Sequence, residues 1–177
     1  MIAPRNSKSQ VRGLSLVEIM IVVGIIALVI VGIQGRGRIG KQTSLIQAES
    51  SNLSLIVERA KSAQMGRPDF SGINTSYLLS MGAFPESMIA SGGTSVKNGW
   101  GGAVTVQPGA GNASVDIVYG EVPSAACVEW VTNEGPNYPE ITIGTTKTKN
   151  GAALPDLDVV GNACKAAEKV SITFSRT

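Results

Sequence analysis

The chain has 177 residues, of which 16% are charged and none is histidine. The missing histidines exclude Ser-His-Asp and Cys-His catalysis, H-E-x-x-H zinc sites and histidine pH switches. The length suits one domain with an appendage. A charged fraction below the usual value of about 25% suits a protein that hides part of its length in a membrane or an assembly.

The net charge of +2 conceals a difference between two regions. Residues 1–67 carry nine Lys/Arg and three Asp/Glu, a net charge of +6, whereas residues 68–177 carry six and ten, a net charge of −4. This split predicts two regions with different surroundings. Because no basic face with interleaved aromatic residues occurs, we expect no nucleic-acid partner.

Residues 14–33 form an apolar run whose only polar members are Ser15 and Glu18. About 20 helical residues span roughly 30 Å, the hydrocarbon thickness of a bilayer, so the run predicts a transmembrane helix. A secretory signal peptide fits less well, since its apolar core has about 7–15 residues and precedes a small-x-small cleavage site. A carboxylate within an apolar span costs about 3 kcal/mol, so Glu18 either has a functional partner or reaches the headgroups.

Residues 13–18, with the sequence GLSLVE before the apolar stretch, resemble the cleavage and N-methylation motif of type IV pilins. The resemblance implies that residues 1–13 are a leader peptide, removed by prepilin peptidase after Gly13, and that Leu14 is then N-methylated. It also implies that Glu18 meets the N-terminal amine of a neighbouring subunit during assembly. The mutual neutralisation of amine and carboxylate explains such burial. Leader length and Leu14 as first mature residue lean toward the type IVb group, which includes the bundle-forming, toxin-coregulated and thin conjugative pilins.

Four glycines follow the apolar run: Gly32, Gly35, Gly37 and Gly40. Their spacing is similar to nucleotide-binding patterns, but Gln42 stands where a P-loop needs Ser or Thr, and no βαβ pattern surrounds them. Each glycine destabilises a helix by up to about 1 kcal/mol relative to alanine, so we predict helix flexibility here. The resemblance implies that helicity is lost in this stretch in assembled pili.

Residues 34–66 are predicted to continue the helix in amphipathic form. Ile39, Ile46, Leu53 and Ala60 recur every seven residues, and Ile56, Val57 and Ala63 widen the stripe. We expect this stripe to pack on the globular part. The residues expected on the outer face are Gln47, Glu49, Glu58, Arg59 and Lys61.

Residues 67–177 are predicted to form a globular head, so that the whole chain is an α+β protein with a long N-terminal helix packed on an antiparallel sheet with short helices. Helices are expected over residues 75–81, 123–134 and 159–168. Strands are expected over residues 103–107, 114–119, 138–145 and 169–175, the first two forming a hairpin. Residues 146–157 are expected to be a polar loop.

Cys127 and Cys164 are the only cysteines. An even number in an exported chain predicts a disulfide; two buried free thiols or a metal site fit less well. The layout also resembles the pilin D-region, which implies that residues 127–164 form a variable surface for subunit or receptor contacts. No cofactor and no metal are expected.

These observations favour a structural subunit, the major pilin of a type IVb pilus, over an enzyme. Its expected partners are copies of itself, prepilin peptidase, the inner-membrane assembly machinery and a receptor on a host or recipient cell. Its expected location is the inner membrane of a Gram-negative bacterium and then the extracellular pilus. Two alternatives stay open: a minor pilin or type II secretion pseudopilin, and a membrane-anchored periplasmic binding module. The nearby pair Asp156 and Asp158 is compatible with a pseudopilin calcium loop, although the cysteine layout fits pilins better.

Overall fold

The computed structural model describes the backbone of residues 16–177 and the side chains of residues 19–23 and 41–177. The chain divides into two compact units, residues 1–41 and 42–177. Helix α1 (Leu16–Gln64) begins in the first unit and ends in the second. The second unit continues with α2 (Thr75–Ser80), β1 (Val104–Pro108), β2 (Val115–Pro123), α3 (Ser124–Glu134), β3 (Glu140–Ile143), β4 (Thr146–Asn150), α4 (Leu157–Lys165) and β5 (Lys169–Arg176).

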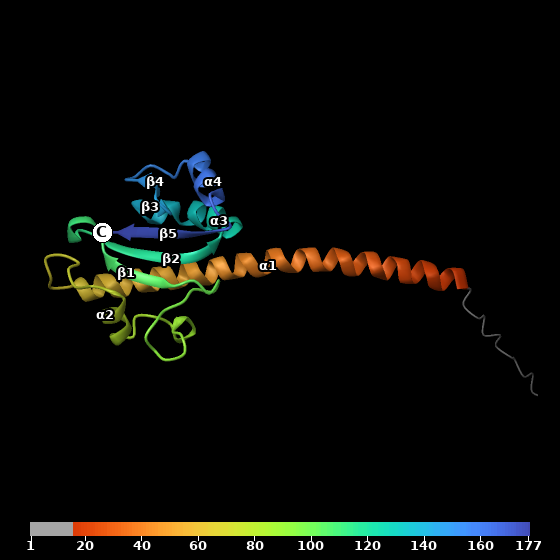
Figure 1. The fold of residues 1–177 in the computed structure, drawn as a ribbon, viewed down its shortest axis with the longest axis horizontal. Helices are drawn as coiled ribbons and strands as arrows, with labels where there is room; N and C mark the ends of the chain where they lie inside the picture. The colour runs from red at the N-terminus through yellow and green to blue at the C-terminus, as the bar shows by residue number, and fades with distance from the viewer. Residues whose placement is uncertain (1–15) are drawn as a thin grey trace, which may run out of the picture. The chain divides into compact units, whose positions relative to one another are not determined.

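The sheet of the second unit has five strands in the order β1-β2-β5-β3-β4, and each neighbouring pair is antiparallel. The last strand of the chain, β5, therefore lies in the middle, between β2 and β3 (Figure 1). The predicted hairpin over residues 103–119 is confirmed as β1 paired with β2. The expected α+β class, a helix with an antiparallel sheet, is likewise confirmed.

One face of the sheet carries the core. In β5, Val170, Ile172 and Phe174 are buried and alternate with more exposed residues, as expected for a strand with one covered face. Helices α1 and α3 both meet this core: Trp130 of α3 lies 5.0 Å from the Phe174 ring, and its indole N–H donates to the Ser50 hydroxyl of α1 at 2.9 Å. The stripe predicted on α1 is buried at every position described: Ile46, Leu53, Ile56, Val57, Ala60 and Ala63.

The expectation of a loop over residues 146–157 is wrong for its first five residues, which form strand β4 at the edge of the sheet. The segment TKTKN carries no apolar alternation, so it reads as a polar loop. Contacts with β3 nevertheless hold it in the sheet. The Thr148 hydroxyl donates to the Ile141 carbonyl at 3.1 Å, and Lys147 forms an ion pair with Glu140 at 2.7 Å. Charged residues such as Lys147 are common on edge strands, where they oppose pairing with other chains.

The placement of Glu49 on the outer face of α1 is also wrong, because its side chain is only 3% exposed. The Gly99 N–H donates to Glu49 Oε1 at 2.8 Å. The turn 98–102 therefore covers a side of α1 that helical periodicity alone assigns to solvent.

Candidate functional site

The residues expected to direct processing and assembly lie at the N-terminal end of the chain. Gly13 and Leu14 lie outside the described residues. Glu18 belongs to α1, but its side chain lies outside the described set. The backbone of α1 is helical at Gly32, Gly35, Gly37 and Gly40, so their flexibility stays a prediction.

Five consecutive apolar side chains of the first unit are exposed: Ile19, Met20, Ile21, Val22 and Val23, each at 50% or more. A contiguous exposed apolar segment marks a surface that meets lipid or protein. The expected span 14–33 lies mostly outside the described side chains, and within the described set no helix is both long and apolar enough to cross a bilayer.

The disulfide joins two helices of the head. Cys127 of α3 and Cys164 of α4 are bonded, with their Cα atoms 5.7 Å apart, and both residues are fully buried. The segment between them contains most of α3, the η3 turn (Gly135–Asn137), β3, β4 and most of α4. The bond thus ties both ends of this segment to each other beneath its surface.

Gly135 is a contact point in the middle of the disulfide-framed segment and directly follows α3. Its backbone carbonyl accepts a hydrogen bond from the buried Lys149 ammonium of β4. A Cβ on Gly135 would lie 2.6 Å from the Pro155 side chain, so only glycine permits this close approach. Asn137 in turn donates through its amide nitrogen to the buried Glu134 at 3.1 Å.

Asp156 acts as the N-cap of α4. Its side chain accepts from the backbone N–H groups of Asp158 and Val159, at 2.9 and 3.3 Å. This cap starts α4 at Leu157, two residues before the expected start. Among the described residues no three His, Cys, Asp or Glu side chains gather as a metal site.

Glu49 and the turn 98–102 form a second contact between α1 and the rest of the head. Burial raises the pKa of Glu49 above its ordinary value, although hydrogen bonds from the Gly99 backbone and the Asn52 side chain act in the opposite direction. Asn98 shapes the turn through its side chain: Oδ1 accepts from the backbone N–H groups of Trp100 and Gly102, and Nδ2 donates to the Gly120 carbonyl.

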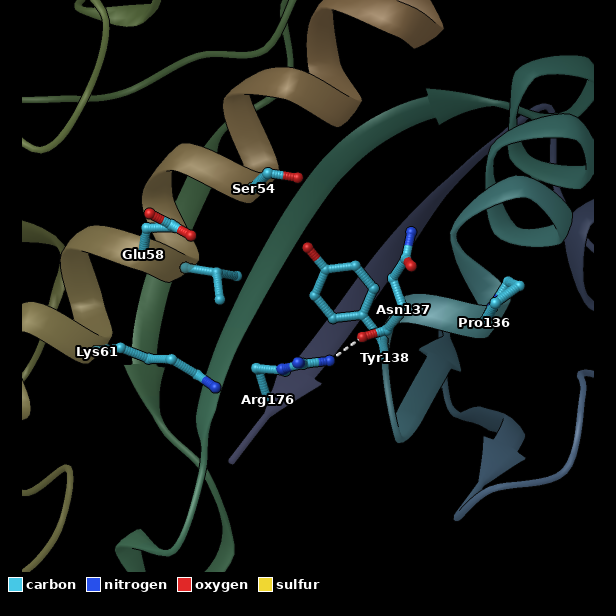
Figure 2. A pocket seen from close by; sticks show the side chains of 8 residues that line it. Ser54, Glu58, Lys61, Pro136, Asn137, Tyr138 and Arg176 are labelled. Carbon is cyan, nitrogen blue, oxygen red and sulfur yellow. Dashed lines mark hydrogen bonds between the residues drawn. The ribbon is translucent and has the colours of Figure 1, made fainter.

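A hollow of about 350 Å³ lies between α1, η3 and the end of β5 (Figure 2). Its lining residues are Ser54, Val57, Glu58, Lys61, Pro136, Asn137, Tyr138 and Arg176. An Arg176 N–H donates to the Asn137 carbonyl, which orients the guanidinium toward η3. Burial, and secondly the charge of Glu134, raise the pKa of Tyr138 well above its ordinary value, so its phenol is neutral.

Neither this hollow nor the burial of Glu49 and Lys149 is predicted by the sequence. No local pattern signals them, because each depends on residues far apart in the chain. Glu49 meets Gly99, 50 positions away, and Arg176 meets Asn137, 39 positions away.

Comparison with known proteins gives consistent results. The family described as PilS N terminal matches residues 43–175. The chain is similar to the crystal structure of a type IV b pilin from Salmonella typhi, with 21% identity and a TM-score of 0.58 over 72% of this chain and 97% of that one. It is also similar to TcpA, a type IV pilin from Vibrio cholerae El Tor biotype, with 15% identity and a TM-score of 0.57 over 76% and 99%. No curated protein matches the chain. At these identities the two structures show a shared fold.

Proposed function

Because the chain belongs to the PilS N terminal family and has the fold of type IVb pilins, we propose that it is the major structural subunit of a type IVb pilus. The observation that supports the proposal is the match of residues 43–175 to this family, together with TM-scores of 0.58 and 0.57 to two such pilins. This family and this fold are those of structural subunits and not of enzymes.

We propose that residues 1–13 are removed by prepilin peptidase and that Leu14 becomes the methylated N-terminus. The GLSLVE sequence at residues 13–18 supports this step. Residues 14–33 would then serve first as the membrane anchor in the inner membrane and later as the assembly segment. Residues 34–66 would carry the head, residues 67–177.

The exposed apolar segment 19–23 supports polymerisation. Lipid covers such a segment before assembly, and the same segments of neighbouring subunits replace lipid in the filament. Contacts between different surfaces of identical subunits generate open helical polymers. Glu18 would pair with the N-terminal amine of a neighbour, since two opposite charges can enter apolar surroundings together more readily than one alone.

The head would face outward in the extracellular filament and make the adhesive, bundling or mating-pair contacts. The disulfide-framed segment 127–164 would supply much of that surface. Flexibility of the helix at Gly32–Gly40 would let the anchor and the head adopt the geometry of the filament.

The test compares three variants of the full chain in its native assembly system. Gly13→Ala should remain uncleaved in the membrane. Glu18→Val should be cleaved but should not form normal extracellular filaments. Glu168→Gln, which removes an exposed carboxylate between α4 and β5 and outside segment 127–164, is the matched control and should assemble normally. Immunoblots of membrane and sheared fractions, with electron microscopy, read out all three.

Normal filaments from both Gly13→Ala and Glu18→Val would overturn the proposal. A different result would identify a minor pilin: filaments that form in a strain lacking this chain, and that contain it only in trace amounts when it is restored. A pseudopilin would instead leave surface filaments unchanged and block protein secretion when deleted.

A further inference from the structure

We propose that the hollow between α1, η3 and β5 binds a carboxylated saccharide, with Arg176 and Lys61 holding the carboxylate. The inference goes beyond the pilin assignment, because the hollow lies within the second unit of a single chain and does not depend on polymerisation.

The hollow carries more basic than acidic side chains. Of its eight lining residues, Lys61 and Arg176 are cationic and Glu58 is acidic (Figure 2). Figure 2 shows Lys61 reaching from α1 toward the strand that carries Arg176. Among the described side chains the ion pairs are Lys147–Glu140 and Lys169–Glu121, so neither cation of the hollow is neutralised by a carboxylate in contact with it.

Two acidic residues lie near these cations, and neither removes their preference for an anion. Glu58 lines the hollow but is exposed, where water screens its charge. Glu134 is buried behind η3 and accepts the Asn137 amide N–H. Arg176 uses one N–H on the Asn137 carbonyl, which fixes the guanidinium and leaves its remaining donors for a ligand. A planar guanidinium fork is well suited to a carboxylate.

The remaining lining groups suit the hydroxyls and ring of a sugar. Asn137 donates its amide N–H to Glu134, so its side-chain oxygen remains an acceptor for a hydroxyl. Ser54 is exposed at the hollow and its hydroxyl can donate or accept. Pro136 is exposed and offers apolar surface to one face of a ring, while the Tyr138 side chain is buried beneath the hollow.

The size of the site supports a saccharide. The volume of 350 Å³ lies within the range of roughly 300–1,000 Å³ typical of small-ligand sites. A second hollow of about 520 Å³ adjoins it and shares Pro136, Asn137, Tyr138 and Arg176. One acidic sugar unit would occupy the first hollow, and a further unit of the chain would extend into the second.

The test is a ligand-observed NMR titration of the full chain in detergent micelles. The probes are N-acetylneuraminic acid, neutral galactose and a short Glu-rich peptide. We expect N-acetylneuraminic acid to bind with a Kd on the order of 1 mM. Galactose should bind about 10-fold more weakly, and binding of the acidic sugar should weaken as salt is added.

Three variants locate the site. Lys61→Gln and Arg176→Gln should each weaken binding of the acidic sugar by about 10-fold, because each removes a charge-assisted hydrogen bond. Lys165→Gln, which removes an exposed lysine at the end of α4, should leave it unchanged. Circular dichroism identifies any variant that fails to fold, and Arg176→Lys, which keeps the charge but loses the fork, should give an intermediate affinity.

Several results would overturn the proposed saccharide site. Absence of binding by the acidic sugar, equal binding of galactose, or an equal loss in Lys165→Gln would overturn the proposal. Tighter binding of the Glu-rich peptide, lost in the same two variants, would also overturn it in favour of a protein partner. None of these results changes whether the chain assembles, so failure of this inference is distinguishable from failure of the pilin assignment.

Discussion

The apolar residues near the two ends of α1 differ in their exposure to solvent. Ile19, Met20, Ile21, Val22 and Val23 follow one another and are all at least 50% exposed, whereas Ile46, Leu53 and Ile56 are spaced along one side and are at most 2% exposed. Consecutive apolar residues cover every side of a helix, and a helix of that kind needs a surrounding partner. A stripe needs only one packed face, which the head of the same chain supplies.

Polar contacts add to this difference. Around the stripe, Glu49 accepts from Gly99 and Ser50 accepts from Trp130, so polar groups of α1 also bond to the head. The second part of α1 is therefore an integral element of a folded domain. The stability of that domain should therefore respond strongly to changes in the stripe and weakly to changes in residues 19–23.

The largest expected effect is loss of the disulfide beneath the framed segment. The double variant Cys127→Ala/Cys164→Ala should lower the free energy of unfolding by about 4 kcal/mol, because a loop with a sequence separation of 37 gains that much entropy in the unfolded state. Urea titrations of the full chain in detergent, followed by tryptophan fluorescence, measure it. A loss below about 1 kcal/mol would contradict the prediction.

The next effect tests the comparison directly. Leu53→Ala should destabilise the head by about 3 kcal/mol, since it opens a cavity at a fully buried position. The matched variant Ile21→Ala removes a similar volume at a position that is 58% exposed, and should leave the same urea midpoint unchanged. Equal losses from the two variants would show that residues 19–23 belong to the cooperative unit of the head.

A smaller effect is expected at Glu49. Glu49→Ala should lower the free energy of unfolding by about 1–1.5 kcal/mol, because it removes the acceptor of the part-buried hydrogen bond from the Gly99 N–H. Glu49→Gln keeps an acceptor of similar shape and removes the buried charge. It should therefore be at least as stable as the wild type at pH 7, and a loss as large as that of Glu49→Ala would show that the charge itself is required.

The direction of the Glu49 pKa shift predicts how stability depends on pH. Burial raises the pKa of the folded state above the ordinary 4.5, so the folded protein binds the proton more tightly than the unfolded chain. This contribution to stability is fully present below pH 4.5 and is lost as the pH rises through the raised pKa. Unfolding midpoints of wild type and Glu49→Gln should diverge over this interval, and parallel curves would contradict the assignment.

Local periodicity was sufficient to predict the α1 stripe, the β1–β2 hairpin and the alternation of β5, because each repeats within a few residues. It was insufficient where a residue is defined by a distant partner. Glu49 lies on a polar side of the helix until the turn 98–102 covers it, and β4 has no apolar alternation because it is an edge strand. The position of β5 between β2 and β3, and the hollow around Arg176, likewise depend on topology.

The smallest expected effect concerns the hydrogen bond between Ser50 and Trp130. Ser50→Ala removes the acceptor of a fully buried indole, and should lower the free energy of unfolding by about 1 kcal/mol. The control Ser51→Ala, one residue along, loses a hydroxyl that only donates to the Gln47 carbonyl of its own helix, and should have no measurable effect. Trp130 packs against Tyr119 and Phe174, so near-ultraviolet circular dichroism should report the change at Ser50 and not at Ser51. Indistinguishable spectra and midpoints for the two variants would mean that the Ser50–Trp130 hydrogen bond makes no measurable contribution to the packing of α1 on the head.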